Sequence, residues 1–176
     1  FHMIKSIKLT NSQKDIMYNN ILLLSRNTIF YTKFDLIDTF QNRIHLIFIH
    51  ISFIFIKIKQ NNKNKIYKIF YQEMFDLIFN KIEVNMREIG FGESTINKNM
   101  RFLVKTFYSI LFSCEKYKEM NLDTKNIFLN KYLELNNIKN TTNNKDIVVY
   151  FDKYEAFCVD LNPDSVLKGE LKFNYK

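Results

Sequence analysis

Few residues in this chain could act in acid–base, nucleophilic or metal chemistry, and their spacing does not suit it. His45 and His50 are five residues apart, whereas two metal ligands on one face of a helix are normally four apart. Ser52 lies two residues after His50, and such neighbours do not face each other on a helix, so they form a poor nucleophile and base. The remaining histidine, His2, precedes Met3. The histidines therefore predict neither a catalytic centre nor a metal site.

The cysteines and glycines also argue against a chemical function. Cys114 and Cys158 stand alone in apolar segments, without the paired spacing of metal-binding or redox cysteines, which predicts buried thiols in a reducing compartment. The three glycines, Gly90, Gly92 and Gly169, cannot build a phosphate-binding loop. We therefore expect a protein that is not an enzyme and that has no cofactor and no small-molecule substrate.

The composition indicates which elements must position the side chains. Of the 176 residues, 47% are hydrophobic, which excludes a largely disordered chain. Only 3 Gly and 1 Pro are present, whereas proteins with many short strands usually need more of both in their turns. We predict an all-α fold, a single compact domain of about six to seven helices over residues 4–176. Residues 1–3 are interpreted as a cloning remnant.

Helical spacing of apolar residues is clearest in two consecutive segments. Between residues 66 and 89 apolar residues recur at steps of three and four, which predicts a helix, and Gly90 then ends it. The predicted inner stripe is Tyr67, Phe70, Tyr71, Met74, Ile78, Ile82 and Met86, widened by Phe75, Phe79 and Ile89. The next helix is predicted to begin at Ser94, and its inner face comprises Ile96, Met100, Leu103, Phe107, Ile110 and Cys114. Further helices are predicted after a capping box of Ser12 and Asp15, after the cap Asp38-Thr39, and over 126–136, 146–159 and the turn that follows Asn162-Pro163.

Segment 44–58, IHLIFIHISFIFIKI, allows more than one interpretation. Its β-branched residues partly alternate, which would permit a strand. It is too short for a membrane span, which needs about 20 apolar residues. As a helix it would carry polar residues on two nearly opposite stripes, so it must be buried on both sides or leave one apolar side for a partner.

The chain is basic, with a net charge of +8 and a pI of about 9.3. Such a balance is typical of proteins that bind nucleic acid, a ribosome or a membrane surface. Only 4 of the 26 basic residues are arginine, the residue best suited to phosphates, so lysines that merely fill solvated positions explain the charge as well. Two alternatives stay open: a basic helical module that binds RNA or the ribosome, and a peripheral protein of the membrane surface.

A series of short motifs occurs in a recognisable order. The motifs are Phe30-Tyr31, DTFQNR at 38–43, Ile49-His50, QEMFD at 72–76, MREIGFG at 86–92, Lys98 and Phe107-Tyr108. In this order and spacing, residues 26–115 resemble the ubiquinol–cytochrome c chaperone family, whose bacterial and mitochondrial members assist assembly of the cytochrome bc1 complex. Asn42, Ile49 and Ser109 depart from the Gly, Leu and Gly that are common in the family, and none of these changes removes a charge.

The resemblance implies an all-helical fold and a chaperone that receives newly made cytochrome b. It also implies a second assembly factor and the ribosome as further partners, and transient proximity to a membrane. The expected compartment is the cytoplasm, at the inner face of the membrane, or the mitochondrial matrix. The positions put forward for partner binding are Asp38, Arg43, His50, Met86, Arg87, Glu88, Phe107 and Tyr108.

Several of these residues have structural interpretations as well. Asp38 could cap the helix that follows it, and His50 could be a hydrogen-bonded core residue. Arg87 could face the negative end of its helix dipole, or pair with Asp38 or Asp76 to join two helices. Each of these roles would explain the residue without any partner.

A holder of membrane segments needs an exposed apolar surface with a polar border. Segments 44–58 and 102–112 are the candidates for that surface, and the alternative is that both form core. Phe107 and Tyr108 are about 100° apart on a helix, so one is expected in the core and the other at the surface. Methionines that could make the surface adaptable are Met74, Met86 and Met100.

Overall fold

Eight α-helices make up the regular structure of the computed structural model, which describes residues 10–60, 65–136 and 145–176. Six of them have eleven or more residues, which confirms the predicted all-α class. The cloning remnant expected at residues 1–3 lies outside the described residues. The helices are α1 (Asn11–Ser25), α2 (Ile29–Thr32), α3 (Phe40–Lys59), α4 (Lys65–Ile89), α5 (Glu93–Lys116), α6 (Leu122–Tyr132), α7 (Lys145–Asp160) and α8 (Pro163–Leu167), and a 3-10 turn, η1 (Tyr117–Glu119), follows α5.

Side-chain caps fix where the helices begin. Thr10 caps α1, and not the predicted Ser12: its hydroxyl accepts the Gln13 N–H at 3.2 Å, and the Gln13 side chain accepts the Thr10 N–H at 3.0 Å. Thr39 caps α3 by accepting the N–H of Asn42 at 3.1 Å. The predicted start of α3 is therefore confirmed, while that of α1 was two residues late.

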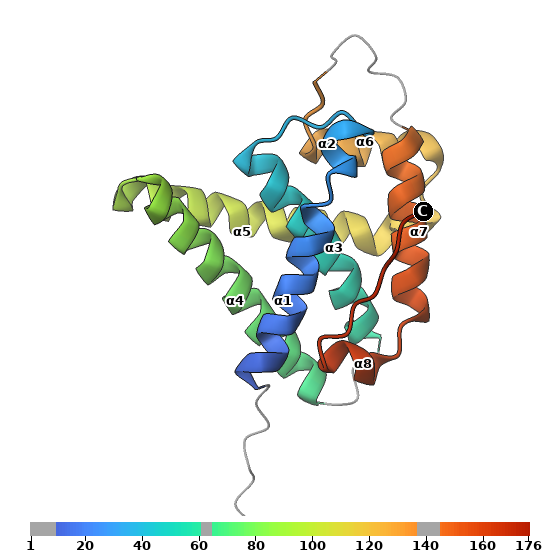
Figure 1. Ribbon diagram of the computed structural model, residues 1–176, viewed down its shortest axis with the longest axis horizontal. Coiled ribbons are helices and arrows are strands. Elements are labelled where there is room, and N and C mark those ends of the chain that lie inside the picture. The colour runs from blue at the N-terminus through green and yellow to red at the C-terminus, as the bar shows by residue number, and fades with distance from the viewer. Residues whose placement is uncertain (1–9, 61–64, 137–144) are drawn as a thin grey trace, which may run out of the picture.

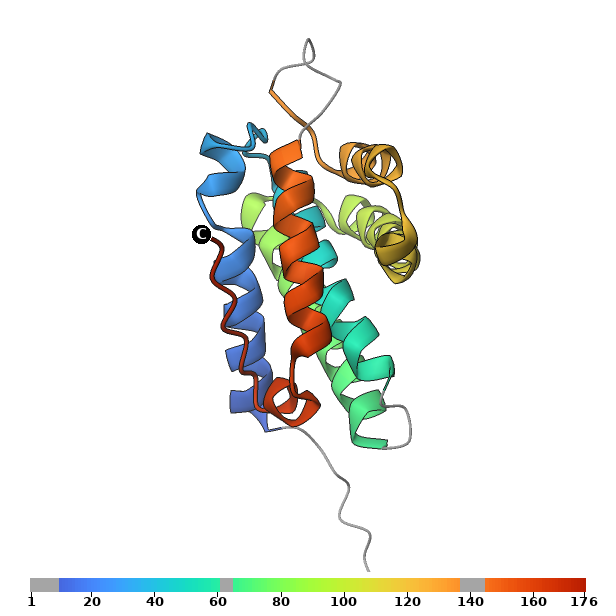
Figure 2. The ribbon, with the colours of Figure 1, turned by 90° about the vertical axis from the view of Figure 1, so that its right-hand side faces the viewer.

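Helix α3 is the centre of the molecule (Figures 1 and 2), and it contacts α1, α4, α5, α7 and α8. Fourteen of its 20 residues are buried, so other elements cover both apolar sides over most of the helix. The strand interpretation of 44–58 is therefore wrong. Burial all round explains the composition, because a helix covered on every side needs no continuous polar face.

Two polar side chains inside α3, Asn42 and Ser52, are held by hydrogen bonds. The amide of Asn42 donates to the carbonyls of Ile37 and Glu134 at 2.8 and 2.9 Å and accepts the Glu134 N–H at 2.9 Å. The Ser52 hydroxyl donates to the carbonyl of Phe48 at 2.6 Å. Asn42, which stands where the resembling family commonly has Gly, thus joins the start of α3 to the segment that follows α6.

Helices α4 and α5 form a hairpin whose turn projects from the body of the molecule (Figure 1). Gly90, with φ +102°, closes α4: its N–H donates to Arg87 O at 3.0 Å and the Phe91 N–H donates to Met86 O at 3.1 Å. The predicted glycine stop is confirmed. Ile89, predicted to widen the buried stripe, is instead 60% exposed because it lies in the projecting turn.

The C-terminal segment packs back along α1 (Figure 2). After α8 the chain turns at Gly169, whose carbonyl accepts a hydrogen bond from the Asn20 side chain at 2.7 Å. Phe173 and Tyr175 then contact the ring of Tyr150 on α7. Among the described residues, no helix is both long and apolar enough to cross a membrane.

Candidate functional site

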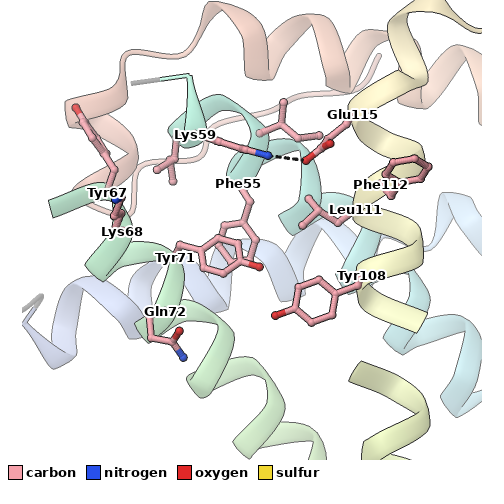
Figure 3. Close-up of a pocket in the computed structure, with 12 residues that line it drawn as sticks. Phe55, Lys59, Tyr67, Lys68, Tyr71, Gln72, Tyr108, Leu111, Phe112 and Glu115 are labelled. Carbon is pink, nitrogen blue, oxygen red and sulfur yellow. Dashed lines mark hydrogen bonds and ion pairs between the residues drawn. The ribbon is translucent and has the colours of Figure 1, made fainter. Parts of the chain in front are cut away.

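A groove lies where the C-terminal part of α3 meets α4 and α5 (Figure 3). Its volume is about 600 Å³, within the range of ligand and peptide sites. We call it the aromatic groove. Its lining residues are Phe55, Ile56, Ile58 and Lys59 of α3, Tyr67, Lys68, Tyr71 and Gln72 of α4, and Tyr108, Leu111, Phe112 and Glu115 of α5.

A row of aromatic rings crosses the aromatic groove from α3 to α5. The centroids of Phe55 and Tyr71 are 4.4 Å apart, and Phe75 stacks on Tyr71 at 6.4 Å and on Tyr108 at 6.0 Å. Tyr108 is 49% exposed and Phe112 57% exposed, so the α5 wall is open to solvent. Large aromatic surfaces left in water are a frequent mark of protein interaction sites.

The border of the aromatic groove is polar. Lys59 donates to a carboxylate oxygen of Glu115 at 3.2 Å, which joins the end of α3 to α5 (Figure 3). The hydroxyls of Tyr71 and Tyr108 point toward each other. Burial, with the neighbouring Tyr108 hydroxyl as a second cause, raises the pKa of Tyr71. Tyr71 therefore stays neutral at physiological pH, and the charged side chains of the lining are Lys59, Lys68 and Glu115.

Of the residues predicted for partner binding, only Tyr108 lies in this groove. Its neighbour Phe107 is buried and packs against Phe48 and Phe79 with ring centroids 5.3 and 5.9 Å away. The expectation of one core residue and one surface residue is met. The prediction that Phe107 contacts a partner directly is corrected, because its ring faces the core.

His50 is likewise a core residue. Its Nδ1–H donates to the Leu46 carbonyl at 2.6 Å, and its Nε2 accepts from the Tyr150 hydroxyl at 2.8 Å. Burial lowers the pKa of His50 to about 4, against the smaller opposite effect of the Leu46 carbonyl. The prediction that His50 contacts a partner directly is corrected as well, because its ring also faces the core.

The prediction that Met74, Met86 and Met100 make an exposed surface adaptable is mostly wrong. Met74 and Met86 lie in the core and are at most 2% exposed, and Met100 is partly buried against it. Met86 was put forward for partner binding, but its side chain points inward from α4 and contributes to packing.

Asp38, Arg43 and Glu88 lie at a second, smaller hollow of about 300 Å³ between α1, α3 and α4, which Arg43 and Glu88 line. Arg43 donates from Nε and Nη2 to the two carboxylate oxygens of Asp38 at 2.7 and 2.8 Å. This hydrogen bonding lowers the pKa of Asp38. Asp38 is thus an ion-pair partner of Arg43, and the capping role considered for it belongs to Thr39.

Arg87 fixes the α4–α5 turn. Its guanidinium donates to Glu83 one helical turn earlier at 3.0 Å and to Glu93 at the start of α5 at 2.9 Å. The bond from Arg87 lowers the pKa of Glu93. The predicted pairing of Arg87 with Asp38 or Asp76 is wrong, because the turn brings Glu93 closer.

The sequence indicated part of this site. Tyr108, Leu111 and Phe112 of the predicted 102–112 face line the groove, whereas 44–58 contributes only its last turns. The sequence placed Tyr67 and Tyr71 on the inner stripe of α4, not in a groove. The signal that could have indicated the groove is that α4 carries more apolar residues than one buried face requires. In the described part of the chain, no three His, Cys, Asp or Glu residues are grouped to hold a metal ion.

Comparisons with known proteins agree with this architecture. The family model described as ubiquinol-cytochrome C chaperone matches residues 32–146. The crystal structure of the Cbp3 homolog from Brucella abortus is similar, with a TM-score of 0.78 and 18% sequence identity over 93% of this chain and 91% of that chain. At that identity the similarity shows a shared fold. No curated protein matches the chain.

Proposed function

Because the chain belongs to the ubiquinol–cytochrome C chaperone family, we propose that it assists cytochrome bc1 assembly by holding newly made cytochrome b in the aromatic groove. The family expected from the sequence motifs is confirmed, and an assembly role follows from it. The client, the groove and the absence of catalysis are our proposals. The family match over residues 32–146 is the observation that carries them.

The chemistry of the aromatic groove suits an apolar client helix. A membrane segment outside the bilayer exposes large apolar side chains, and burying one of them contributes about 1.5–3 kcal/mol. The groove offers aromatic rings and the partly buried Leu111 to such side chains. Its α5 wall is exposed at Tyr108 and Phe112, so a client helix can reach the groove from solvent.

The groove border supplies orientation. Lys59, Lys68 and Glu115 place charges where the edge of an inserted helix would meet water. Polar groups at a border favour one register over another, because a wrong register leaves a charge desolvated. Holding a client in this way requires no bond to be made or broken.

We propose a separate surface for other assembly partners. Arg43 and Glu88 are exposed at the second hollow, where Ile89 also lies. Beside the hollow, Arg43 pairs with Asp38 and Arg87 pairs with Glu93. A second assembly factor that docks there would leave the aromatic groove free. We also propose that the protein acts near the ribosome and at the inner face of the membrane.

Crosslinking to newly translated cytochrome b tests the client proposal. Cell-free translation of cytochrome b without membranes would be run with the purified protein, carrying benzoylphenylalanine at position 108 or, as a control, at position 102. Phe102 is 62% exposed on the same helix and does not line the groove. We expect adducts from position 108 alone, and a capture roughly tenfold weaker in Tyr108→Ala/Leu111→Gln. Equal crosslinking at both positions, or unchanged capture, would exclude the groove.

A further inference from the structure

The outward side of α5 carries three lysines, two phenylalanines and a serine. Six positions follow one another at steps of four, three, four, three and four residues, so they share one side of the helix over roughly 27 Å. All six are exposed. We call them the α5 stripe: Lys98, Phe102, Lys105, Ser109, Phe112 and Lys116.

Folding does not account for the two phenylalanines of the α5 stripe. The opposite side of α5 supplies its core contacts through Leu103, Phe107 and Ile110. Phe102 is 62% exposed and Phe112 57% exposed, so most of each ring is in water. Phe112 borders the aromatic groove but Phe102 does not, so the exposed aromatic surface continues beyond the groove.

Charge on this side of α5 is mostly positive. Beside the three lysines of the α5 stripe lies the exposed Arg101, and the nearby carboxylate of Glu115 is bonded to Lys59. Lys116 also places its ammonium 4.0 Å from the ring centroid of Phe112. The positive charge of Lys116 and the apolar ring of Phe112 therefore lie next to each other on the surface of α5.

We propose that the α5 stripe binds the surface of an anionic lipid bilayer. With α5 lying parallel to the membrane, the phenyl rings enter the boundary between headgroups and acyl chains. The flexible lysine stems let the ammonium groups stay at the depth of the lipid phosphates. Because Phe112 belongs to both surfaces, this orientation puts one end of the aromatic groove next to the membrane.

The geometry favours a bilayer over single-stranded nucleic acid, the other polyanion that aromatic and basic residues bind. A nucleic-acid strand follows a groove and stacks successive bases on aromatic rings. The α5 stripe lies on the outside of a helix, and its two rings are ten residues, or about 15 Å, apart. Lys116 further occupies one face of the Phe112 ring.

The lack of tryptophan in the chain gives a direct test. Phe102→Trp introduces a single tryptophan in the α5 stripe, which can be excited selectively over the 10 tyrosines. Leu23→Trp places one at a 72% exposed position of α1 as control. Vesicles of phosphatidylcholine with 30% phosphatidylglycerol should shift the emission of the first variant to shorter wavelength and leave the second unchanged. Vesicles of phosphatidylcholine alone should shift neither. Absence of the shift, or an equal shift in both variants, overturns the proposal.

Vesicle flotation of the full chain tests the lysines. Lys105→Gln should weaken partitioning to the anionic vesicles about fivefold, and Lys172→Gln, at an exposed position of the C-terminal segment, should not change it. Phe102→Ser should reduce flotation while cytochrome b capture stays normal, which separates this proposal from that of the groove. Flotation unchanged by Phe102→Ser, or single-stranded RNA binding that Phe102→Ser abolishes without vesicle binding, overturns it.

Discussion

Phe107 and Tyr108 are adjacent, yet their environments differ completely. Phe107 is 1% exposed among the aromatic rings of α3 and α4, while Tyr108 is 49% exposed at the groove. Phe107→Ala should lower the free energy of unfolding by about 3–5 kcal/mol, because it leaves a cavity. Tyr108→Ala should lower it by about 1 kcal/mol or less. Urea denaturation of both variants checks this, and equal losses would contradict the assigned orientations.

His50 makes the stability depend on pH. Its pKa is about 4 in the folded protein and about 6.5 in the unfolded chain. The unfolded chain therefore binds the proton more tightly, and stability falls as pH decreases from 6.5 toward 4. Between pH 7.5 and 5 the loss from this residue is about 2 kcal/mol. Tyr150 and Tyr154 face His50 from α7, and burial raises the pKa of both, so they stay neutral throughout.

A variant without the imidazole isolates this contribution. His50→Gln is expected to be less stable at pH 7.5, since the Tyr150 hydroxyl loses its acceptor. Its free energy of unfolding should vary about 2 kcal/mol less between pH 7.5 and 5 than that of the parent protein. Urea denaturation at the two pH values measures the difference. The same pH dependence in both proteins would show that folding does not lower the pKa of His50.

Among the elements, α3 is the one whose structure and burial could not be predicted from its own residues. Its residues permit a strand, a partner-binding helix or a buried helix, and only neighbouring helices decide between them. The amphipathic α5 was easier to predict, because one face carries the apolar residues that become core. Its outer phenylalanines were predicted as a surface, yet which of them reach a groove depends on how α4 crosses α5.

The turn between α4 and α5 and the one after α8 both depend on a glycine with positive φ. Gly90 has φ +102° and open space where a Cβ would lie, so Gly90→Ala should cost only the backbone strain of about 1–2 kcal/mol. Gly169 has φ +81°, and its Cβ would lie 2.8 Å from Ile16 Cγ2, so Gly169→Ala should cost about 1–3 kcal/mol more. Thermal unfolding compares the two.

Gly92 supplies the control for these substitutions. Its φ is −73° and nothing lies near the position of a Cβ, so Gly92→Ala should change stability by about 0.5 kcal/mol or less. A cost at Gly92 equal to that at Gly90 would mean that positive φ is not the reason for the glycine in the turn.

At the scale of the whole molecule, sequence motifs identified the family more readily than the site. Many motif residues serve the fold: His50 and Phe107 are core, and Arg87 fixes a turn. The aromatic groove is formed by three helices, and no single stretch of sequence contains it. Its lining could not be derived from the periodicity of each helix alone, because that periodicity does not give the angle at which helices cross.

The part of the chain that matches the family model should not fold on its own. Residues 32–146 contain α3 but lack α1, α8 and nearly all of α7. Those helices supply Met17, Ile21, Tyr150 and Tyr154, all at most 1% exposed in the core. Losing one such large side chain typically costs about 2–5 kcal/mol, so losing four costs about 8–20 kcal/mol, as much as the whole stability of about 5–15 kcal/mol of a typical domain. We expect the full chain to unfold cooperatively in urea and the 32–146 fragment to show neither near-ultraviolet circular dichroism nor a cooperative transition. A fragment that unfolds cooperatively, with the near-ultraviolet spectrum of the full chain, would show that α3 can be buried by α4, α5 and α6 alone.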